Sequence, residues 1–129
     1  MKMLLDTHVF LWWVSDNPRL GKEARNIISN IDNQLFLSAA SGWEIAIKAG
    51  LGKLEMSDDI CSFMFEQMRL NAVTELPVSI NHALHVATLP NLHRDPFDRL
   101  LISQAQLERM PILTGDKQFG AYSVEIIEV

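Results

Sequence analysis

Residues 1–8 read MKMLLDTH, a short apolar run that ends in an acidic residue. The run Lys2–Asp6 has the length and the bulky apolar composition of a buried strand. Strands disfavour aspartate, so Asp6 has no propensity reason to close this one. Thr7 can cap the helix that we predict over His8–Ser15, which leaves the Asp6 carboxylate free. We therefore interpret Asp6 as a functional residue at the carboxyl end of a strand.

Short apolar runs and amphipathic stretches alternate along the rest of the chain. Apolar runs bounded by turn-forming residues predict strands over Lys2–Asp6, Gln34–Ser38, Ala72–Val78, Pro111–Thr114 and, at the sheet edge, Ser123–Val129. Apolar residues at helical spacing predict helices over His8–Ser15, through Leu20, Ala24, Ile27, Ile28 and Ile31, over Ser41–Ala49, from an N-cap at Ser57 through Ile60, Phe63, Met64 and Met68, and over Ile80–Thr88 and Phe97–Leu107. This alternation predicts an α/β fold with three α/β/α layers and a mostly parallel sheet of four to five strands.

Length and composition indicate one domain over residues 1–129, because a chain of this size can bury a core without disulfide or metal support. The single cysteine, Cys61, cannot form an internal disulfide, which favours a reducing cytoplasm. The longest apolar run, Val9–Val14, is far shorter than the ~20 residues of a membrane helix. The net charge of −5 argues against a protein that coats nucleic acid non-specifically, although it does not exclude a nuclease.

Four acidic residues follow strand-like runs or open helix-like runs. They are Asp6, Glu44, Asp98 and Asp116. In an open parallel α/β sheet, ligands bind in the crevice outside the carboxyl ends of the strands. Four carboxylates gathered there would repel one another unless a hard cation lay between them. The pattern therefore predicts a site for Mg²⁺, with Mn²⁺ as an alternative, and phosphate chemistry.

Each of these acids also has a local explanation, which for Asp6 is the N-cap of the helix His8–Ser15, a role that Thr7 could serve instead. Ser41 and Glu44 fit a capping box, with serine at the N-cap and glutamate three residues later. Asp95 and Asp98 flank a helix start in which either can cap; we assign the cap to Asp95 and the metal to Asp98, and the two roles could be exchanged. Asp116 follows a glycine, which is common in a simple turn.

Basic residues near the acids in sequence could form a rim that attracts phosphate, or could be ordinary solvated charges. They are Lys48, Lys53, Arg94, Arg99 and Lys117. The histidines lack the spacing of metal ligands, and we interpret His8, His82 and His85 as structural and place His93 near the site. The chain has no nucleophile elbow, P-loop or dinucleotide-binding glycine motif.

Taken in order, these motifs resemble the PIN-domain nucleases and, within them, the VapC-type toxins of bacterial toxin–antitoxin pairs. The segments that resemble the family are LLDTH (4–8), WEIAIK (43–48), GKL (52–54), HRDPFDRLL (93–101) and TGD (114–116). The resemblance implies that the family's acidic quartet is Asp6, Glu44, Asp98 and Asp116, the last at its least constant position. It also implies that the supporting hydroxyls are those of Thr7 and Thr114.

The resemblance further implies a magnesium-dependent endoribonuclease that cuts structured RNA, such as tRNA or rRNA, at a single-stranded loop. One bound ion would activate a water for attack on phosphorus, and another would neutralise the leaving oxygen. Such toxins form homodimers and are silenced by a small antitoxin that blocks the acidic pocket. Apolar residues in excess of one helix face could serve these interfaces or could belong to the core. They are Phe10, Trp12, Trp13, Phe63, Met64, Phe65 and Met68.

Three other classes of protein share part of the pattern. A phosphatase of the haloacid-dehalogenase type needs a second acid two positions after the first, where this chain has His8. A receiver-like signalling domain has its phosphorylated aspartate after an internal strand and needs a late lysine, and Lys117 fits that role poorly. A non-catalytic RNA- or protein-binding domain of the same fold would not need an intact acidic quartet, and only an activity test separates it from a nuclease.

Overall fold

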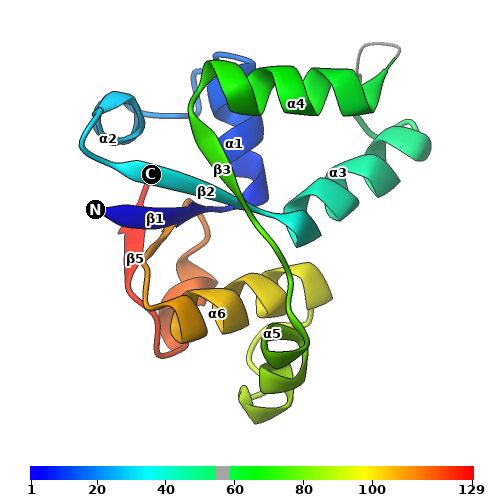
Figure 1. Ribbon diagram of the computed structural model, residues 1–129. Helices are drawn as coiled ribbons and strands as arrows, with labels where there is room; N and C mark the ends of the chain where they lie inside the picture. The colour runs from blue at the N-terminus through cyan, green and yellow to red at the C-terminus, as the bar shows by residue number, and fades with distance from the viewer. Residues whose placement is uncertain (55–58) are drawn as a thin grey trace.

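The computed structural model describes residues 1–54 and 59–129 (Figure 1). Its sheet has five strands in the order β3-β2-β1-β4-β5, and every neighbouring pair is parallel. The strands are β1 (Lys2–Leu5), β2 (Gln34–Ser38), β3 (Val73–Leu76), β4 (Ile112–Thr114) and β5 (Ile126–Glu128). The prediction of a mostly parallel sheet with the last strand at an edge is confirmed.

The central strand β1 determines where the site forms. In register, Met3 lies opposite Leu35 of β2, and Leu5 lies opposite Leu113 of β4. All of β1 except Lys2 is buried, because helices cover both faces of a parallel sheet. The strands β2, β1 and β4 end side by side, so the residues that follow them are brought to one edge of the sheet.

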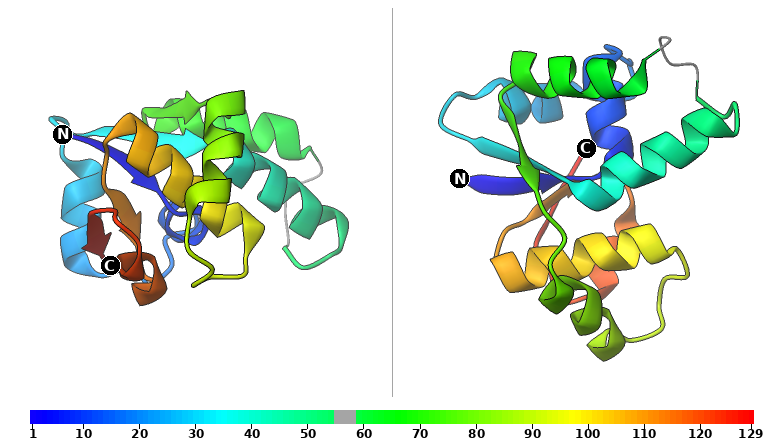
Figure 2. Two further views of the ribbon diagram at one scale, coloured as in Figure 1. Left: turned by 90° about the horizontal axis from the view of Figure 1, so that it is seen from below. Right: turned by 45° about the vertical axis from the view of Figure 1, so that its right-hand side comes forward.

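Six α-helices and two short 3₁₀ helices complete the described parts of the chain. They are α1 (Thr7–Val14), α2 (Lys22–Ser29), α3 (Ala39–Gly50), α4 (Ile60–Leu70), α5 (Ile80–His85), η1 (Val86–Thr88), α6 (Pro96–Glu108) and η2 (Lys117–Ala121). Figure 2 shows α1, α2 and α4 on one face of the sheet and α5 and α6 on the other, with α3 leading away from the end of β2. These are the three layers that the alternation of elements predicts.

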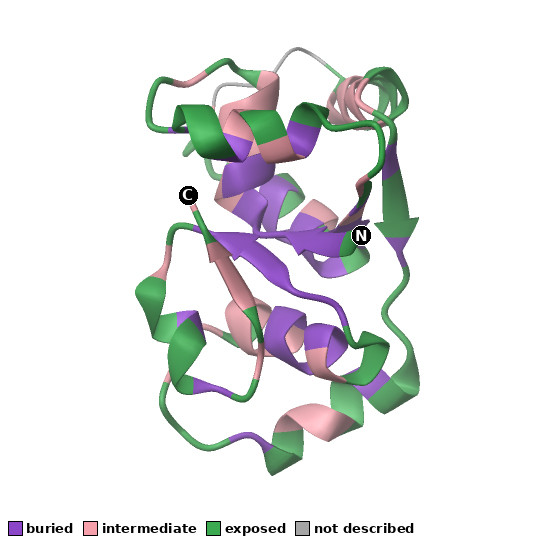
Figure 3. Cartoon of the chain, turned by 90° about the vertical axis from the view of Figure 1, so that its left-hand side faces the viewer, coloured by how far each residue is buried: buried purple, intermediate pink, exposed green. Residues whose placement is uncertain are grey.

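Two hydrophobic clusters fill the spaces between the layers. Met3 and Leu5 face the cluster that includes Phe10 of α1, whereas Leu4 faces the cluster that includes Ile102 of α6. Successive side chains of a strand point to opposite faces, so one short strand supplies both cores. Figure 3 shows this burial along the middle of the sheet, with exposed residues on the outer turns of the helices.

Some predicted element boundaries are wrong for local reasons. Ile31 lies beyond α2, which ends at Ser29, and it is 95% exposed rather than part of a buried stripe. The third strand is shorter than predicted because Ala72 has φ of +52° and Pro77 has no N–H for a strand ladder. The predicted cap Ser57 lies outside the described residues.

The apolar excess of α1 and α4 has two different outcomes. Phe10 is buried, and Trp12 and Trp13 are partly buried against the core, so α1 uses its aromatic residues mainly for packing. Helix α4 has no fully buried residue, and Phe65 is 71% exposed. No helix in the described ranges is both long and apolar enough to cross a membrane.

Candidate active site

Asp6 lies at the junction of β1 and α1, and its side chain is 1% exposed. It occupies the N-cap position of α1, yet its side chain makes no capping bond. The Thr114 hydroxyl donates to Oδ2 of Asp6 at 2.6 Å, and Nε2 of His8 lies 3.0 Å from the same oxygen. The other oxygen, Oδ1, has no hydrogen-bond partner among the described residues. A buried carboxylate oxygen without a partner is costly, so it points to a ligand.

Glu44 is not part of a capping box, and that prediction is wrong. Ser38 caps α3 instead, because its hydroxyl accepts a hydrogen bond from the N–H of Ala40 at 3.0 Å. The helix therefore begins at Ala39, two residues before Ser41. The Ser41 hydroxyl accepts a hydrogen bond from Thr7 at 2.8 Å, which joins α1 to α3. With the cap provided elsewhere, Glu44 has no role in starting the helix.

The Glu44 side chain is buried, with one oxygen paired and one unpaired. Oε2 lies 3.1 Å from Nζ of Lys48, one helical turn along α3. Oε1 has no hydrogen-bond partner within the part of the chain that the structure describes. Glu44 therefore resembles Asp6: one carboxylate oxygen contacts a protein group, and the other has no partner among the described residues.

Asp95 caps α6, as we assigned from the sequence. Oδ1 of Asp95 accepts the N–H groups of Phe97 and Asp98 at 2.8 and 3.3 Å, so Asp95 caps α6. Burial raises the pKa of Asp98 to about 7, and the negative charges of Asp6 and Asp95 act in the same direction. Such a shift indicates that Asp98 lies close to the other acids in a partly desolvated pocket.

Asp116 both forms its turn and faces the other acids. Its Oδ1 accepts the N–H of Gln118 at 2.9 Å and caps η2, and its own N–H donates to the Thr114 hydroxyl at 2.9 Å. Its Oδ2 lies 3.3 Å from Nε2 of His93. Asp116 therefore caps the turn, as the simple explanation predicts, and also lies beside His93.

Two histidines belong to the site, and sequence reasoning placed only His93 near it. Nε2 of His93 lies 3.1 Å from Asp98 and 3.3 Å from Asp116, and the three donor atoms lie within 4.8 Å of one another. Nδ1 of His93 accepts the N–H of Asp95 at 3.2 Å, which assigns the proton to Nε2. The hydrogen bond between His8 and Asp6 raises the pKa of His8. The available signal was position, since His8 follows Asp6 by two residues and His93 precedes Asp95 by two.

We call Asp6, Glu44, Asp98, Asp116 and His93 the acid centre, and its donor set fits a divalent cation. Carboxylate oxygens are the ligands that Mg²⁺ and Mn²⁺ take. The unpartnered oxygens of Asp6 and Glu44 and the raised pKa of Asp98 are what an ion would relieve. A proton or a cation is needed to hold these carboxylates together.

Of the five residues of the proposed basic rim, two bind other groups of the protein and three are exposed. The guanidinium of Arg99 donates to the backbone oxygen of Pro90 at 2.8 Å and of Leu89 at 3.3 Å, so it holds the segment before α6 rather than lying free at the rim. Lys48 is paired with Glu44. The remaining three residues of the rim are exposed: Lys53, Arg94 and Lys117.

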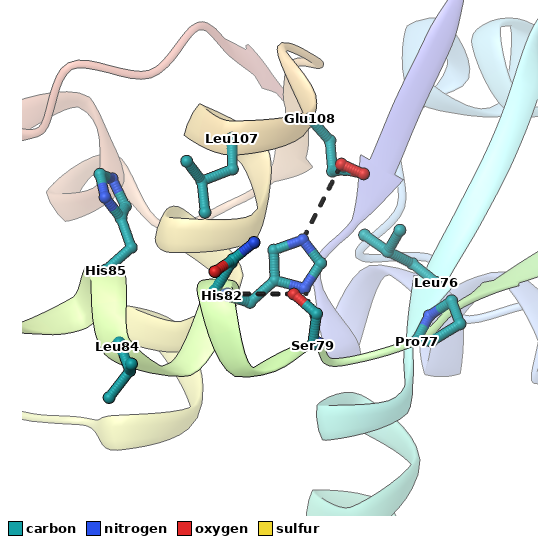
Figure 4. Close-up of a pocket in the computed structure, with 9 residues that line it drawn as sticks. Leu76, Pro77, Ser79, His82, Leu84, His85, Leu107 and Glu108 are labelled. Carbon is teal, nitrogen blue, oxygen red and sulfur yellow. Dashed lines mark hydrogen bonds and ion pairs between the residues drawn. The ribbon is translucent and has the colours of Figure 1, made fainter.

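A second polar cluster lies between α5 and α6, beside a pocket of about 830 Å³ (Figure 4). We call it the His82 cluster, and its members are Ser79, His82, Ser103, Gln104 and Glu108. Ser79 and His82 form a capping box at the start of α5, and the Ser103 hydroxyl donates to the His82 carbonyl at 2.6 Å. Nε2 of His82 lies 3.8 Å from Glu108, at the margin of an ion pair. These contacts fit the structural interpretation of His82.

A parallel sheet with acidic residues at its carboxyl edge defines the class of this α/β domain, and comparison with known proteins gives its family. The model of the PIN domain family matches residues 3–125, so the chain belongs to the PIN domain family. It is 38% identical over 73 residues to Ribonuclease VapC16 of Mycobacterium tuberculosis (strain ATCC 25618 / H37Rv), a match to 54% of this chain and only about half (52%) of that protein. Ribonuclease VapC22 of the same organism is 26% identical over 121 residues, covering 93% of this chain and 91% of that protein.

A solved structure shows the same fold at low sequence identity. The crystal structure of VapBC2 from Rickettsia felis, bound to a DNA fragment from its promoter, contains a chain that superposes with a TM-score of 0.73. The match covers 99% of this chain and 98% of that one, at 16% identity.

Proposed function

We propose that this protein is a metal-dependent endoribonuclease that hydrolyses phosphodiester bonds of RNA as the toxin of a toxin–antitoxin pair. The observation that carries the proposal is the pair of unpartnered, buried carboxylate oxygens on Asp6 and Glu44, beside an Asp98 whose pKa is raised to about 7. The similarity to two proteins named Ribonuclease VapC supports RNA as the substrate.

The acid centre would hold the metal through Asp6, Asp98, Glu44 and Asp116. When bound, divalent ions supply Lewis-acid chemistry that activates water and neutralises charge on the leaving oxygen. The Thr114 hydroxyl donates to Oδ2 of Asp6, which leaves Oδ1 as the oxygen that is free to bind a metal ion. The Thr7–Ser41 hydrogen bond keeps α1 and α3 in place and so sets the separation of Asp6 from Glu44.

His93 adds a positioning role to this scheme. Its Nε2–H lies within hydrogen-bond reach of both Asp98 and Asp116, and it opposes the rise in the pKa of Asp98. It therefore holds two carboxylates from different elements, α6 and the end of β4, in one arrangement. Groups that orient ligands in this way commonly affect metal affinity by about 10- to 100-fold.

The finer parts of the proposal concern the substrate and the compartment. We propose structured RNA, such as tRNA or rRNA, cut at a single-stranded loop, with Mg²⁺ as the usual ion and Mn²⁺ as a substitute. We place the activity in the cytoplasm, where such RNA is found and where the exposed Cys61 would stay reduced. These parts rest on the family resemblance rather than on any contact to a base or a 2′-hydroxyl.

We propose a small antitoxin and a second copy of this chain as the protein partners. A similar structure from Klebsiella pneumoniae is described as a toxin–antitoxin complex, and one from Mycobacterium tuberculosis as a member of the VapBC family of toxin–antitoxin systems. In this chain, a pocket of about 280 Å³ between α3 and α4 is lined mostly by apolar side chains, including Met64 and Phe65. Light scattering at micromolar concentration should show a dimer, and a monomer would contradict that part of the proposal.

The experiment that tests the nuclease is cleavage of total RNA by the purified chain with Mg²⁺, with Mn²⁺ and with EDTA. We expect discrete cuts that need metal and disappear in Asp6→Ala. Asp32→Asn, which alters an exposed acid away from the acid centre, is the matched control and should cleave normally. Cleavage that persists in EDTA or in Asp6→Ala would overturn the proposal.

A further inference from the structure

One pocket beside the acid centre has a lining that the metal chemistry does not explain. It has a volume of about 530 Å³ and is lined by His8, Trp12, Arg19, Gly115, Asp116 and Lys117. Asp116 belongs to the acid centre, and His8 lies 3.0 Å from Asp6. Any molecule that fills this pocket therefore lies directly beside the proposed reacting phosphate. We call it the Trp12 pocket.

An aromatic wall forms one side of the Trp12 pocket. His8 and Trp12 are four residues apart on α1, so they share one helix face, and their ring centroids are 5.3 Å apart. Trp12 is partly buried and packs against the core. Its ring edge lies beside Gly115, where an added Cβ would be 3.7 Å from the six-membered ring, so a larger residue at position 115 would crowd the indole.

Two exposed cations complete the pocket. Neither Arg19 nor Lys117 forms an ion pair within residues 1–54 and 59–129. The loop that carries Arg19 is fixed by Arg25, whose guanidinium donates to the carbonyls of Leu20 and Asn17 at 2.8 and 2.7 Å. In a chain with a net charge of −5, two unpaired cations beside a carboxylate cluster are a local exception that favours an anion.

A second basic pocket lies on the other side of β1. It has a volume of about 390 Å³, and its lining includes Glu44, Lys53 and Arg94. Glu44 follows β2 and Asp116 follows β4, and these strands flank β1 on opposite sides. A polyanion that crosses the acid centre would therefore meet cations before and after it.

We propose that the Trp12 pocket binds one nucleotide of a single-stranded RNA next to the scissile phosphate, with its base stacked on Trp12 and its phosphate held by Arg19 and Lys117. The inference rests on the proposed ribonuclease function and specifies the substrate as an unpaired strand. Proteins that bind single strands combine a basic groove with aromatic side chains on which bases stack, and this pocket has both. A base within a duplex is stacked on its neighbours and cannot reach such a wall.

The fluorescence of the three tryptophans tests where the base binds. A short oligouridylate is titrated with Mg²⁺ into Asp98→Asn, which should bind without cleaving. We expect quenching that is lost in Asp98→Asn/Trp12→Phe and retained when Trp13 or Trp43 is replaced by phenylalanine. Trp13 is the matched control, since its indole donates to Asn71 at 2.8 Å rather than lining the pocket. Quenching that disappears with Trp43→Phe instead would overturn the assignment.

Affinity gives a second readout in the same background. Trp12→Leu should weaken binding of the oligouridylate by about 5- to 100-fold, and Trp12→Phe should weaken it less, because phenylalanine can still stack. Since Trp12 also packs against the core, thermal unfolding must show that each variant is folded at the temperature of the measurement. Unchanged affinity in a folded Trp12→Leu variant would overturn the stacking.

The salt dependence of RNA binding tests the two cations. Both side chains are exposed, so replacing them does not disturb the core. Arg19→Gln and Lys117→Gln should each reduce the slope of log affinity against log salt by about one. Arg69→Gln, an exposed cation on α4 outside the pocket, is the matched control and should leave the slope unchanged. Equal slopes for all three variants would overturn the phosphate contact.

Competing ligands and catalysis separate this inference from the proposed function. The same sequence as a duplex, and inorganic phosphate, should bind far more weakly than the single strand; equal binding of the duplex would overturn the single-strand specificity. Wild-type cleavage with an unchanged KM in Trp12→Leu would overturn the pocket and leave the nuclease standing. Trp12-dependent quenching without cleavage of any RNA would support the pocket and overturn the proposed nuclease.

Discussion

The acid centre and the His82 cluster are both partly buried groups of polar residues with a histidine beside a carboxylate, yet they differ in whether their polar atoms have hydrogen-bond partners. In the His82 cluster, Ser79 caps a helix and Ser103 binds a carbonyl, and Glu108 is the single acid. The acid centre brings four acids together and leaves oxygens of Asp6 and Glu44 without a partner.

The comparison teaches that unsatisfied charge, rather than cavity size, separates a site from a structural cluster. The pocket at the His82 cluster is larger, at about 830 Å³, than the pocket of about 530 Å³ at the acid centre. The His82 cluster also has an exception, because Oε1 of Gln104 is buried without a partner. A neutral amide oxygen costs less to leave unpaired than a carboxylate does. Mutations in the acid centre should therefore change the cleavage rate, whereas mutations in the His82 cluster should change the free energy of unfolding.

The largest expected effect is on cleavage. Asp6→Asn should reduce the cleavage rate by on the order of 1,000-fold or more, because it removes charge where the transition state needs electrostatic support. The same change should leave the free energy of unfolding unchanged or raise it by about 1 kcal/mol, since a buried charge is removed. Cleavage assays and urea unfolding measure the two effects. Loss of both activity and stability would make the acid centre a structural cluster.

His82→Ala should show the opposite pattern. It removes the acceptor of the Ser79 N–H and should lower the free energy of unfolding by about 1–3 kcal/mol. Cleavage measured well below the melting temperature should stay within about twofold of the wild type. A large loss of kcat in a folded His82→Ala protein would show that the His82 cluster takes part in cleavage rather than only in stability.

His93→Gln should weaken the binding of both ions at the acid centre. His93 donates its Nε2–H toward Asp98 and Asp116 and accepts the Asp95 N–H at Nδ1, so it orients carboxylates and has no nitrogen left for a metal. Mg²⁺ and Mn²⁺ should therefore lose affinity alike, by about 10-fold. Isothermal titration calorimetry with each ion measures the two losses, and His85→Gln, which alters a histidine of α5, is the control. A loss confined to Mn²⁺ would instead make the imidazole a direct ligand.

The pH dependence of stability follows from Asp98. Its pKa is raised to about 7 in the folded chain, so the folded form keeps a proton that the unfolded form releases near pH 4. The stability that this proton provides is complete below about pH 4 and is lost as the pH rises to about 7. In EDTA, the difference in unfolding free energy between wild type and Asp98→Asn should therefore change over that range, and a flat difference would contradict the shift.

The smallest effect is expected for Glu108→Gln. Glu108 is partly exposed and lies 3.8 Å from His82, so loss of its charge should change the free energy of unfolding by less than about 0.5 kcal/mol. Differential scanning calorimetry can resolve this against His82→Ala. A change as large as that of His82→Ala would mean that the charge, rather than the capping box, holds the cluster.

The sequence was sufficient for the layers of the fold because local patterns decide them. The run before Asp6 is apolar on both faces, as a central parallel strand must be, and the structure places it there. The start of α3 was not decidable in this way. Ser38 and Ser41 both satisfy the local rule for a cap, and the choice between them is settled by Thr7, which binds Ser41 from another helix.

Sequence pattern singles out the acids that the structure brings together in the acid centre, whereas it does not reveal the contacts that hold them. Each of Asp6, Asp98 and Asp116 follows a strand or opens a helix, which sequence pattern can detect. The role of His93 depends on Asp116, 23 residues away, and that of Thr114 depends on Asp6, 108 residues away. No local pattern encodes such contacts, and the same is true of Arg99, whose charge is used by carbonyls of the preceding segment.

The contact between Thr114 and Asp6 also determines when, during synthesis of the chain, the acid centre can be completed. Asp6 leaves the ribosome early, but the hydroxyl that fixes its carboxylate is added 108 residues later. At synthesis rates of about 5–20 residues per second, that interval is roughly 5 to 20 s. Throughout that interval the nascent chain has β1 without its neighbour β4, so the acid centre stays incomplete until nearly the whole chain has been made.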